Sequence, residues 1–74
     1  MPRVDVREQR EVLLRRLAER RIELGLSQQE LGDLVGIRQP VVSRIEHGVV
    51  SPQLDTFLAL LDALKLRIDL EGSS

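Results

Sequence analysis

The sequence predicts an all-α fold, a compact domain of four helices followed by one short C-terminal strand. Three observations support this prediction. Apolar residues recur at helical spacing in four segments, which span about 6–24, 28–35, 39–47 and 53–65. Glycines at positions 25, 36 and 48 follow the first three segments, where helices commonly end in a left-handed conformation. Residues 66–70 instead alternate apolar and polar side chains with the period of a strand.

The size of the chain favours one domain over residues 1–74, because 74 residues are too few for two hydrophobic cores. A chain of this size buries only about 60% of its unfolded surface, so a monomer is marginally stable. Cysteine is absent, which excludes disulfides and cysteine zinc sites and fits a reducing compartment. We find neither an apolar run of about 20 residues nor a signal peptide, and we therefore expect a soluble, cytoplasmic protein without a membrane segment.

The net charge of −1 counts against nucleic-acid binding, since DNA-binding domains are often basic. The charges are unevenly distributed, however. Residues 1–24 hold seven arginines against five acids, whereas residues 51–74 hold two basic residues against four acids. The acids thus gather at the C-terminal end. We expect a DNA complex of this chain to have few phosphate contacts and an affinity that salt weakens.

The first helix, over residues 6–24, is predicted to open with a capping box formed by Asp5 and Glu8. Its arginines alternate with glutamates, which is typical of a solvated face with i,i+4 pairing rather than a DNA-binding patch. The apolar side chains of the helix are expected to face the core: Val6, Leu13, Leu14, Leu17 and Leu24.

The next two helices are joined by a very short turn. Ser27 and Glu30 form a capping box for residues 28–35, and Leu31, Leu34 and Val35 follow at helical spacing. Gly36 then ends the helix, and an apolar pattern resumes at once. Two short helices with such a connector must cross steeply, as in a helix-turn-helix motif that places its second helix on DNA.

The helix over residues 39–47 has two distinct faces at about 100° per residue. One face is apolar and is expected to pack inward: Ile37, Val41, Val42 and Ile45. The opposite face carries polar groups and no carboxylate: Gln39, Ser43 and His47, with Pro40 and Arg44 toward one flank. Glutamine can form paired hydrogen bonds with adenine, arginine can do so with guanine, and serine can hydrogen-bond to either base. Glu46 lies at the seam, where an exposed carboxylate would repel phosphate, so we expect it to be turned inward and paired.

The fourth helix, over residues 53–65, follows a connector. Either Ser51 caps this helix with Pro52 at its first position, or Gln53 begins it. Val49 and Val50 in that connector could contact either the DNA backbone region or a partner subunit. The apolar residues of the helix are spaced for a buried stripe: Leu54, Phe57, Leu58, Leu61 and Leu64.

The tail alternates Leu66, Ile68 and Leu70 with Arg67 and Asp69. A lone strand leaves its backbone groups unpaired, and the same segment of a second copy is the simplest partner. We therefore predict a homodimer in which an antiparallel ribbon crosses a two-fold axis. Its two recognition helices, about 34 Å apart, would read a palindromic operator. The alternative is a frayed tail.

Residues 10–66 resemble the helix-turn-helix domains of the Cro/repressor type, known as the XRE family. The resemblance rests on residues of matching type at matching spacing: Gln28, Leu31, Gly32, Val35, Gly36, Ile37, Val42 and Ile45. It implies that the residues facing DNA are Gln28 at a phosphate and Arg38, Gln39, Ser43 and Arg44 at the groove. It also implies an ion pair between Arg21 and Glu46 behind the motif. Pro40 departs from the pattern and disfavours helical geometry at Gln39.

Within that family, the short body and the L-x-I-x-L tail look like a HipB-type antitoxin. That resemblance implies a dimeric repressor that autoregulates its operon and binds a kinase-like toxin. Restriction-modification controller proteins and phage-type repressors share the helical body and remain alternatives. A protein-interaction module that does not bind DNA is a further alternative.

An enzyme is not expected. His47 is the only histidine, cysteine is absent, and neither a phosphate-binding glycine loop nor a nucleophile elbow is present. His47 follows the last turn of a helix, where the helix dipole or a DNA contact explains it better than catalysis. One histidine without fixed carboxylates does not make a metal site, so we expect no metal and no cofactor. The sequence thus predicts a regulator that binds double-stranded DNA sequence-specifically.

Overall fold

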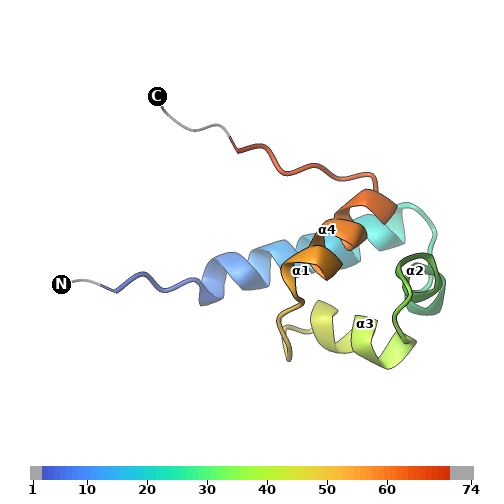
Figure 1. The fold of residues 1–74 in the computed structure, drawn as a ribbon, viewed down its shortest axis with the longest axis horizontal. Helices are drawn as coiled ribbons and strands as arrows, with labels where there is room; N and C mark the ends of the chain where they lie inside the picture. Colours follow the sequence, from blue (N-terminus) through green and yellow to red (C-terminus); the bar gives the residue numbers. More distant parts are fainter. Residues whose placement is uncertain (1–2, 71–74) are drawn as a thin grey trace.

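The computed structural model describes residues 3–70, which form four α-helices and no strand, so the all-α prediction is confirmed (Figure 1). The helices are α1 (Arg7–Glu23), α2 (Gln28–Val35), α3 (Gln39–Glu46) and α4 (Leu54–Ala63). The last helix ends earlier than predicted, because Lys65 adopts a left-handed backbone with φ 57°. Such a residue stops a helix even when it is not glycine.

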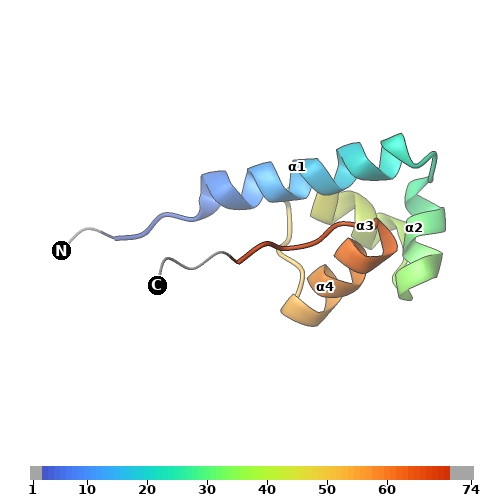
Figure 2. The same cartoon turned by 90° about the horizontal axis from the view of Figure 1, so that it is seen from above.

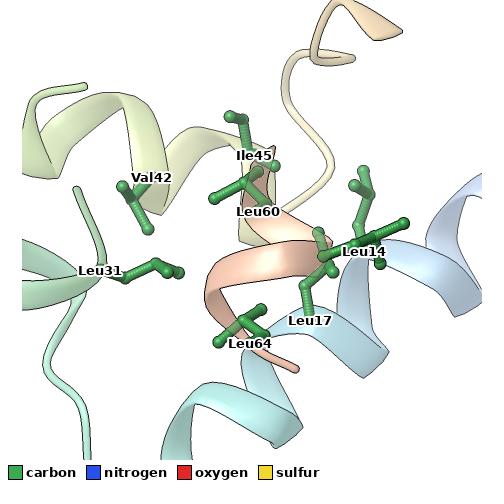
Figure 3. Close-up of a cluster of buried hydrophobic side chains, with 8 residues drawn as sticks. Leu14, Leu17, Leu31, Val42, Ile45, Leu60 and Leu64 are labelled. Atoms are coloured by element: carbon green, nitrogen blue, oxygen red, sulfur yellow. The ribbon is translucent and has the colours of Figure 1, made fainter. Parts of the chain in front are cut away.

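The core lies where the C-terminal half of α1 meets the three shorter helices. Its buried side chains converge from all four helices, as Figure 3 shows for Leu14, Leu17, Leu31, Val42, Ile45, Leu60 and Leu64. Leu61 of α4 is also buried in this cluster. The first two turns of α1 project away from this cluster (Figure 2). Burial of this small set of aliphatic side chains holds α3 in place, since α3 contributes both Val42 and Ile45.

Four residues that the sequence assigns to the core are exposed instead: Val6, Leu13, Leu54 and Leu58. The reason is a mismatch in helix length. The ten residues of α4 span about 15 Å, whereas the 17 residues of α1 span about 26 Å. The first turns of α1 therefore extend past α4, and Val6, Leu13 and Leu54 line an open groove between the two helix starts instead of a closed core.

The predicted capping box of Asp5 and Glu8 is wrong. Val6 is the N-cap of α1 and has no side-chain cap bond. Asp5 lies one position too early to cap the helix, and its Oδ1 accepts from the backbone N–H of Arg7 at 3.0 Å. The Arg7 guanidinium also donates to the Asp5 carboxylate, and these contacts lower the pKa of Asp5. The helix therefore begins after a short turn that Asp5 stabilises.

The predicted C-terminal strand is also not formed in the described residues. Leu66 is tied back to the end of α4 by a hydrogen bond from its N–H to the Leu61 carbonyl, at 2.8 Å, and is partly buried. Ile68 and Leu70 are exposed. A strand exists only through pairing, and residues 3–70 of one chain offer this segment no second strand. Its extended course beyond α4 is seen in Figure 1.

The described helices include none that combines the length and the apolar character needed to cross a bilayer.

Candidate nucleic-acid interface

The start of α2 is fixed by the predicted capping box. The Ser27 hydroxyl accepts from the Glu30 N–H at 2.9 Å, and the Glu30 carboxylate accepts from the Ser27 N–H at 2.9 Å. These two bonds satisfy backbone donors that the first turn of a helix leaves free. The hydrogen bond from the Ser27 backbone, followed by that from its side chain, lowers the pKa of Glu30. The direction of α2 is thereby set at its first residue.

The turn between α2 and α3 depends on two glycines. Gly36 has φ 78°, which reverses the chain at low conformational cost. At Gly32 the turn folds back onto α2, and the Ile37 N–H donates to the Gly32 carbonyl at 2.9 Å. A Cβ at Gly32 would collide with the Ile37 carbonyl oxygen. The absence of a side chain there lets the turn lie directly against α2, so the two helices are held in a fixed relation.

The outer face of α3 is polar and accessible. Gln39, Pro40, Arg44 and His47 are exposed, and Ser43 is half-buried. Pro40 stands in the first turn of the helix, where its missing N–H would have no intrahelical partner. Arg38 is the N-cap, with an extended backbone and an exposed side chain. This face therefore combines an amide, a hydroxyl and guanidinium groups on a rigid helix.

His47 is held by its own helix. Its Nδ1 lies 2.7 Å from the carbonyl oxygen of Ser43. A carbonyl can only accept, so the hydrogen of this contact belongs to Nδ1. The other ring nitrogen, Nε2, takes no part in this contact at the end of α3.

Glu46, the one carboxylate of α3, faces inward. Arg21 Nε donates to Glu46 Oε2 at 2.7 Å, and Arg21 Nη2 donates to Oε1 at 3.1 Å. The two side chains are only 13% and 6% exposed. Arg21 Nη1 also donates to the Leu26 carbonyl at 2.7 Å, which ties the guanidinium to the loop before α2. This is the pair that the resemblance implies, and it removes a negative charge from the surface of α3.

Gln28 connects this pair to the outer face. Its Nε2 donates to Glu46 Oε1 at 3.0 Å, and its Oε1 accepts from Gln39 Nε2 at 2.7 Å. The first residues of α2 and α3 are therefore joined side chain to side chain. Each glutamine was predicted from the sequence to contact DNA, but the hydrogen bond between the two was not predicted. That contact depends on the crossing of the two helices.

Two further residues border the site and were not anticipated. Gln29 and Asp33 line an open hollow at the junction of α2 and α3, together with Arg38 and Gln39. Their spacing of four residues on a helix places them on one face, which is the pattern that could have revealed them. In the part of the chain that the structure describes, no group of histidine and acidic side chains could hold a metal ion.

Comparison with known proteins identifies this arrangement. A family model described as helix-turn-helix matches residues 17–70, which include the end of α1 and all of α2, α3 and α4. The chain belongs to the XRE-type helix-turn-helix family. In that helix-turn-helix domain, α2 is the first helix of the motif and α3 is the second. The family is not an enzyme family.

A curated relative supports membership of the same family. The chain is similar to a protein of Haemophilus influenzae named as an uncharacterized HTH-type transcriptional regulator, with 46% identity over 55 residues. The match covers 74% of this chain and 56% of the relative. The helix-turn-helix chain thus spans little more than half the length of that curated protein.

Proposed function

We propose that this helix-turn-helix protein is a transcriptional regulator that binds double-stranded DNA sequence-specifically and acts as a repressor in the cytoplasm. The observation that carries the proposal is the division of charge on α3. Its polar face is accessible, while its one carboxylate is paired with Arg21 on the other side. A helix arranged in this way can approach the major groove without placing an acid against phosphate. The regulator name of the Haemophilus influenzae relative supports it.

Each polar group on this face has a suitable role. Gln39, Ser43 and Arg44 are proposed to meet base edges, because amide, hydroxyl and guanidinium groups match the donors and acceptors there. Gln28 and Arg38, at the starts of α2 and α3, are proposed to contact phosphates or the groove edge. Pro40 and His47 complete the contact surface at either end of α3.

The test is selection of bound duplexes from a random pool, followed by binding titrations with the enriched sequence. We expect a palindromic sequence to be enriched. Gln39→Ala and Arg44→Ala should each cost about 1–3 kcal/mol of binding free energy and relax one base position. Asp62→Ala, on the exposed surface of α4, is the matched control and should bind normally. A pool without enrichment would favour the protein-interaction module instead.

We further propose that the regulator is a homodimer that uses its C-terminal segment. The apolar side chains left exposed around it support this: Val6 and Leu13 of the α1 region, Leu54 of α4, and Ile68 and Leu70 of the tail. A nearly apolar groove runs between the start of α1 and the start of α4, lined by Leu13, Leu54 and Phe57. Neighbouring apolar side chains that stay exposed are a feature of protein interfaces.

The tail sequence is also self-complementary. If two tails pair antiparallel about a two-fold axis through Ile68, Leu66 stands opposite the partner's Leu70. In the same register Arg67 stands opposite the partner's Asp69, and this pair occurs twice. Opposite charges in such positions stabilise strand pairing. Deletion of residues 66–74 should therefore abolish the dimer in sedimentation experiments, and a full-strength dimer after deletion would contradict the proposal.

We propose, as a finer assignment, that the regulator is the antitoxin of a HipB-type pair, represses its own operon and binds a kinase-like toxin. The support is the tail pattern that follows a four-helix body. Co-expression with the product of the adjacent gene tests it, since a toxin should co-purify. A methyltransferase or endonuclease gene next to this one would instead favour a restriction-modification controller. A phage-type repressor would have neither kind of neighbour.

A further inference from the structure

Four polar side chains form a continuous chain of hydrogen bonds from the interior to the outer face of α3. Arg21 donates to both oxygens of Glu46, at 2.7 Å and 3.1 Å. Gln28 Nε2 donates to Glu46 Oε1 at 3.0 Å. Gln39 Nε2 in turn donates to Gln28 Oε1 at 2.7 Å. This series of hydrogen bonds begins at the nearly buried Arg21 and Glu46 and ends at the exposed Gln39.

The direction of every bond in this chain follows from its first member. An ionised carboxylate can only accept, so the end of Gln28 that faces Glu46 must be its NH₂ group. The carbonyl oxygen of Gln28 is then the end that remains for Gln39, and it also can only accept. Gln39 must therefore turn its own NH₂ group toward Gln28. The placement of oxygen and nitrogen in both amides is dictated from Glu46.

This direction decides what Gln39 offers to a ligand. With one N–H occupied by Gln28, the amide keeps its Oε1 and one further N–H. An acceptor beside a donor is the pair that reads the N6 amino group and N7 of adenine. An amide group that flips freely exchanges its oxygen and its NH₂ group, and it then no longer presents one fixed donor–acceptor pair to adenine. An exposed glutamine without a neighbour samples both orientations, and many rotamers, at little cost.

We infer that Glu46 is a positioning residue that, through Gln28, fixes the amide direction of Gln39 and thereby its choice of base. Glu46 does not touch a ligand itself, because its side chain is 6% exposed. Arg21 holds both carboxylate oxygens of Glu46 with one guanidinium, so the orientation is imposed on Gln39 by an anchored side chain. The base-reading part of this inference rests on the proposed DNA-binding function.

The first test uses the free protein and needs no DNA. In NMR spectra of ¹⁵N-labelled protein, the side-chain NH₂ signals of Gln28 and Gln39 should differ from those of the exposed Gln29 and exchange more slowly with water. Gln28→Met removes the middle link and leaves the buried ion pair intact. The double variant Arg21→Met/Glu46→Met removes the anchor without leaving a buried charge unpaired. In both variants the Gln39 signals should move to the position of an unrestrained amide.

The second test measures base preference at the position that Gln39→Ala identifies. Both variants should lower the preference for adenine there by about three- to tenfold, whereas other positions keep their preferences. Adding Gln28→Met to the double variant should not change the base preference at this position any further, because both changes interrupt the same series of hydrogen bonds. Arg20→Met, which removes a hydrogen bond from Arg20 Nε to the Leu64 carbonyl at 3.0 Å, is the structural control and should not alter base preference.

The outcomes separate the two proposals. Gln39 signals that do not respond to loss of Glu46 would overturn the inference, whether or not DNA binds. Base preferences that stay unchanged in the Arg21→Met/Glu46→Met variant, with only a uniform loss of affinity for all sequences, would also overturn it, since that is the effect of a merely structural pair. If the NMR response is as expected and the wild-type protein binds no duplex, the DNA-binding function fails while the orienting role of Glu46 stands.

Discussion

Arg21 and Glu46, separated by 25 residues in the chain, face each other so that one guanidinium donates to both carboxylate oxygens. This contact has two consequences. It ties α1 to α3, which share little else besides the apolar core. It also leaves the outer face of α3 with guanidinium, amide and hydroxyl groups and no acid, which is the property on which the proposed DNA binding depends.

Arg21→Met should destabilise the protein by about 3–5 kcal/mol, because it leaves the Glu46 carboxylate buried without its cation. The double variant with Glu46→Met should lose less than the sum of the two single changes. Urea unfolding followed by circular dichroism measures both. The control is Arg16→Met, which breaks an exposed pair with Glu23 at 3.4 Å and should cost less than about 1 kcal/mol. Equal losses for Arg21 and Arg16 would contradict the prediction.

Gly32→Ala should lower the free energy of unfolding by about 1–3 kcal/mol, because the new methyl group must displace the turn at Ile37. DNA affinity should fall as well, since the turn sets the position of α3 relative to α2. Thermal unfolding gives the stability. Asp33→Ala, one residue along and exposed, should change stability by less than about 0.5 kcal/mol. A Gly32 variant as stable as the wild type would show that the turn is not closely packed.

Glu30 should contribute stability that depends on pH. Its pKa is lowered by the hydrogen bonds from the Ser27 backbone and side chain, so the folded state favours the ionised form. The contribution is therefore present above the ordinary glutamate pKa of about 4.3, and it disappears as pH falls through the lowered folded value. Glu30→Gln should flatten this part of the curve of unfolding midpoint against pH. A variant curve parallel to the wild-type curve throughout would contradict the assignment.

The charge pattern of the tail predicts that dimer affinity lost by one charge reversal is restored by a second one. Arg67→Asp alone places two acids opposite each other twice in the proposed ribbon, and should weaken the dimer by about tenfold. Asp69→Arg alone should do the same with two cations. The exchange of both residues restores opposite charges across the axis, so dimer affinity should return to within about threefold of the wild type. Analytical ultracentrifugation measures all three, and failure of the double exchange to recover would exclude this register.

The local elements were the predictable part of the fold. The capping box of Ser27 and Glu30 and the left-handed Gly36 depend on residues a few positions apart, and both appear where the pattern predicts them. The apolar spacing also identified the buried face of α3, with Val42 and Ile45. The failures arose where a residue's environment depends on a distant element. Leu13 and Leu54 have core-like spacing, yet no helix of the described chain reaches far enough to cover them.

The sequence by itself determined the four helices, the capping box of α2 and the polar face of α3, because these follow from backbone chemistry and from the 3.6-residue period. Only the tertiary structure decided that Gln28 bonds to both Glu46 and Gln39. It also decided that the segment after α4 runs unpaired through the described residues. Hydrogen bonds between side chains require an approach of about 3 Å, and that distance is set by how helices cross rather than by their order in the chain.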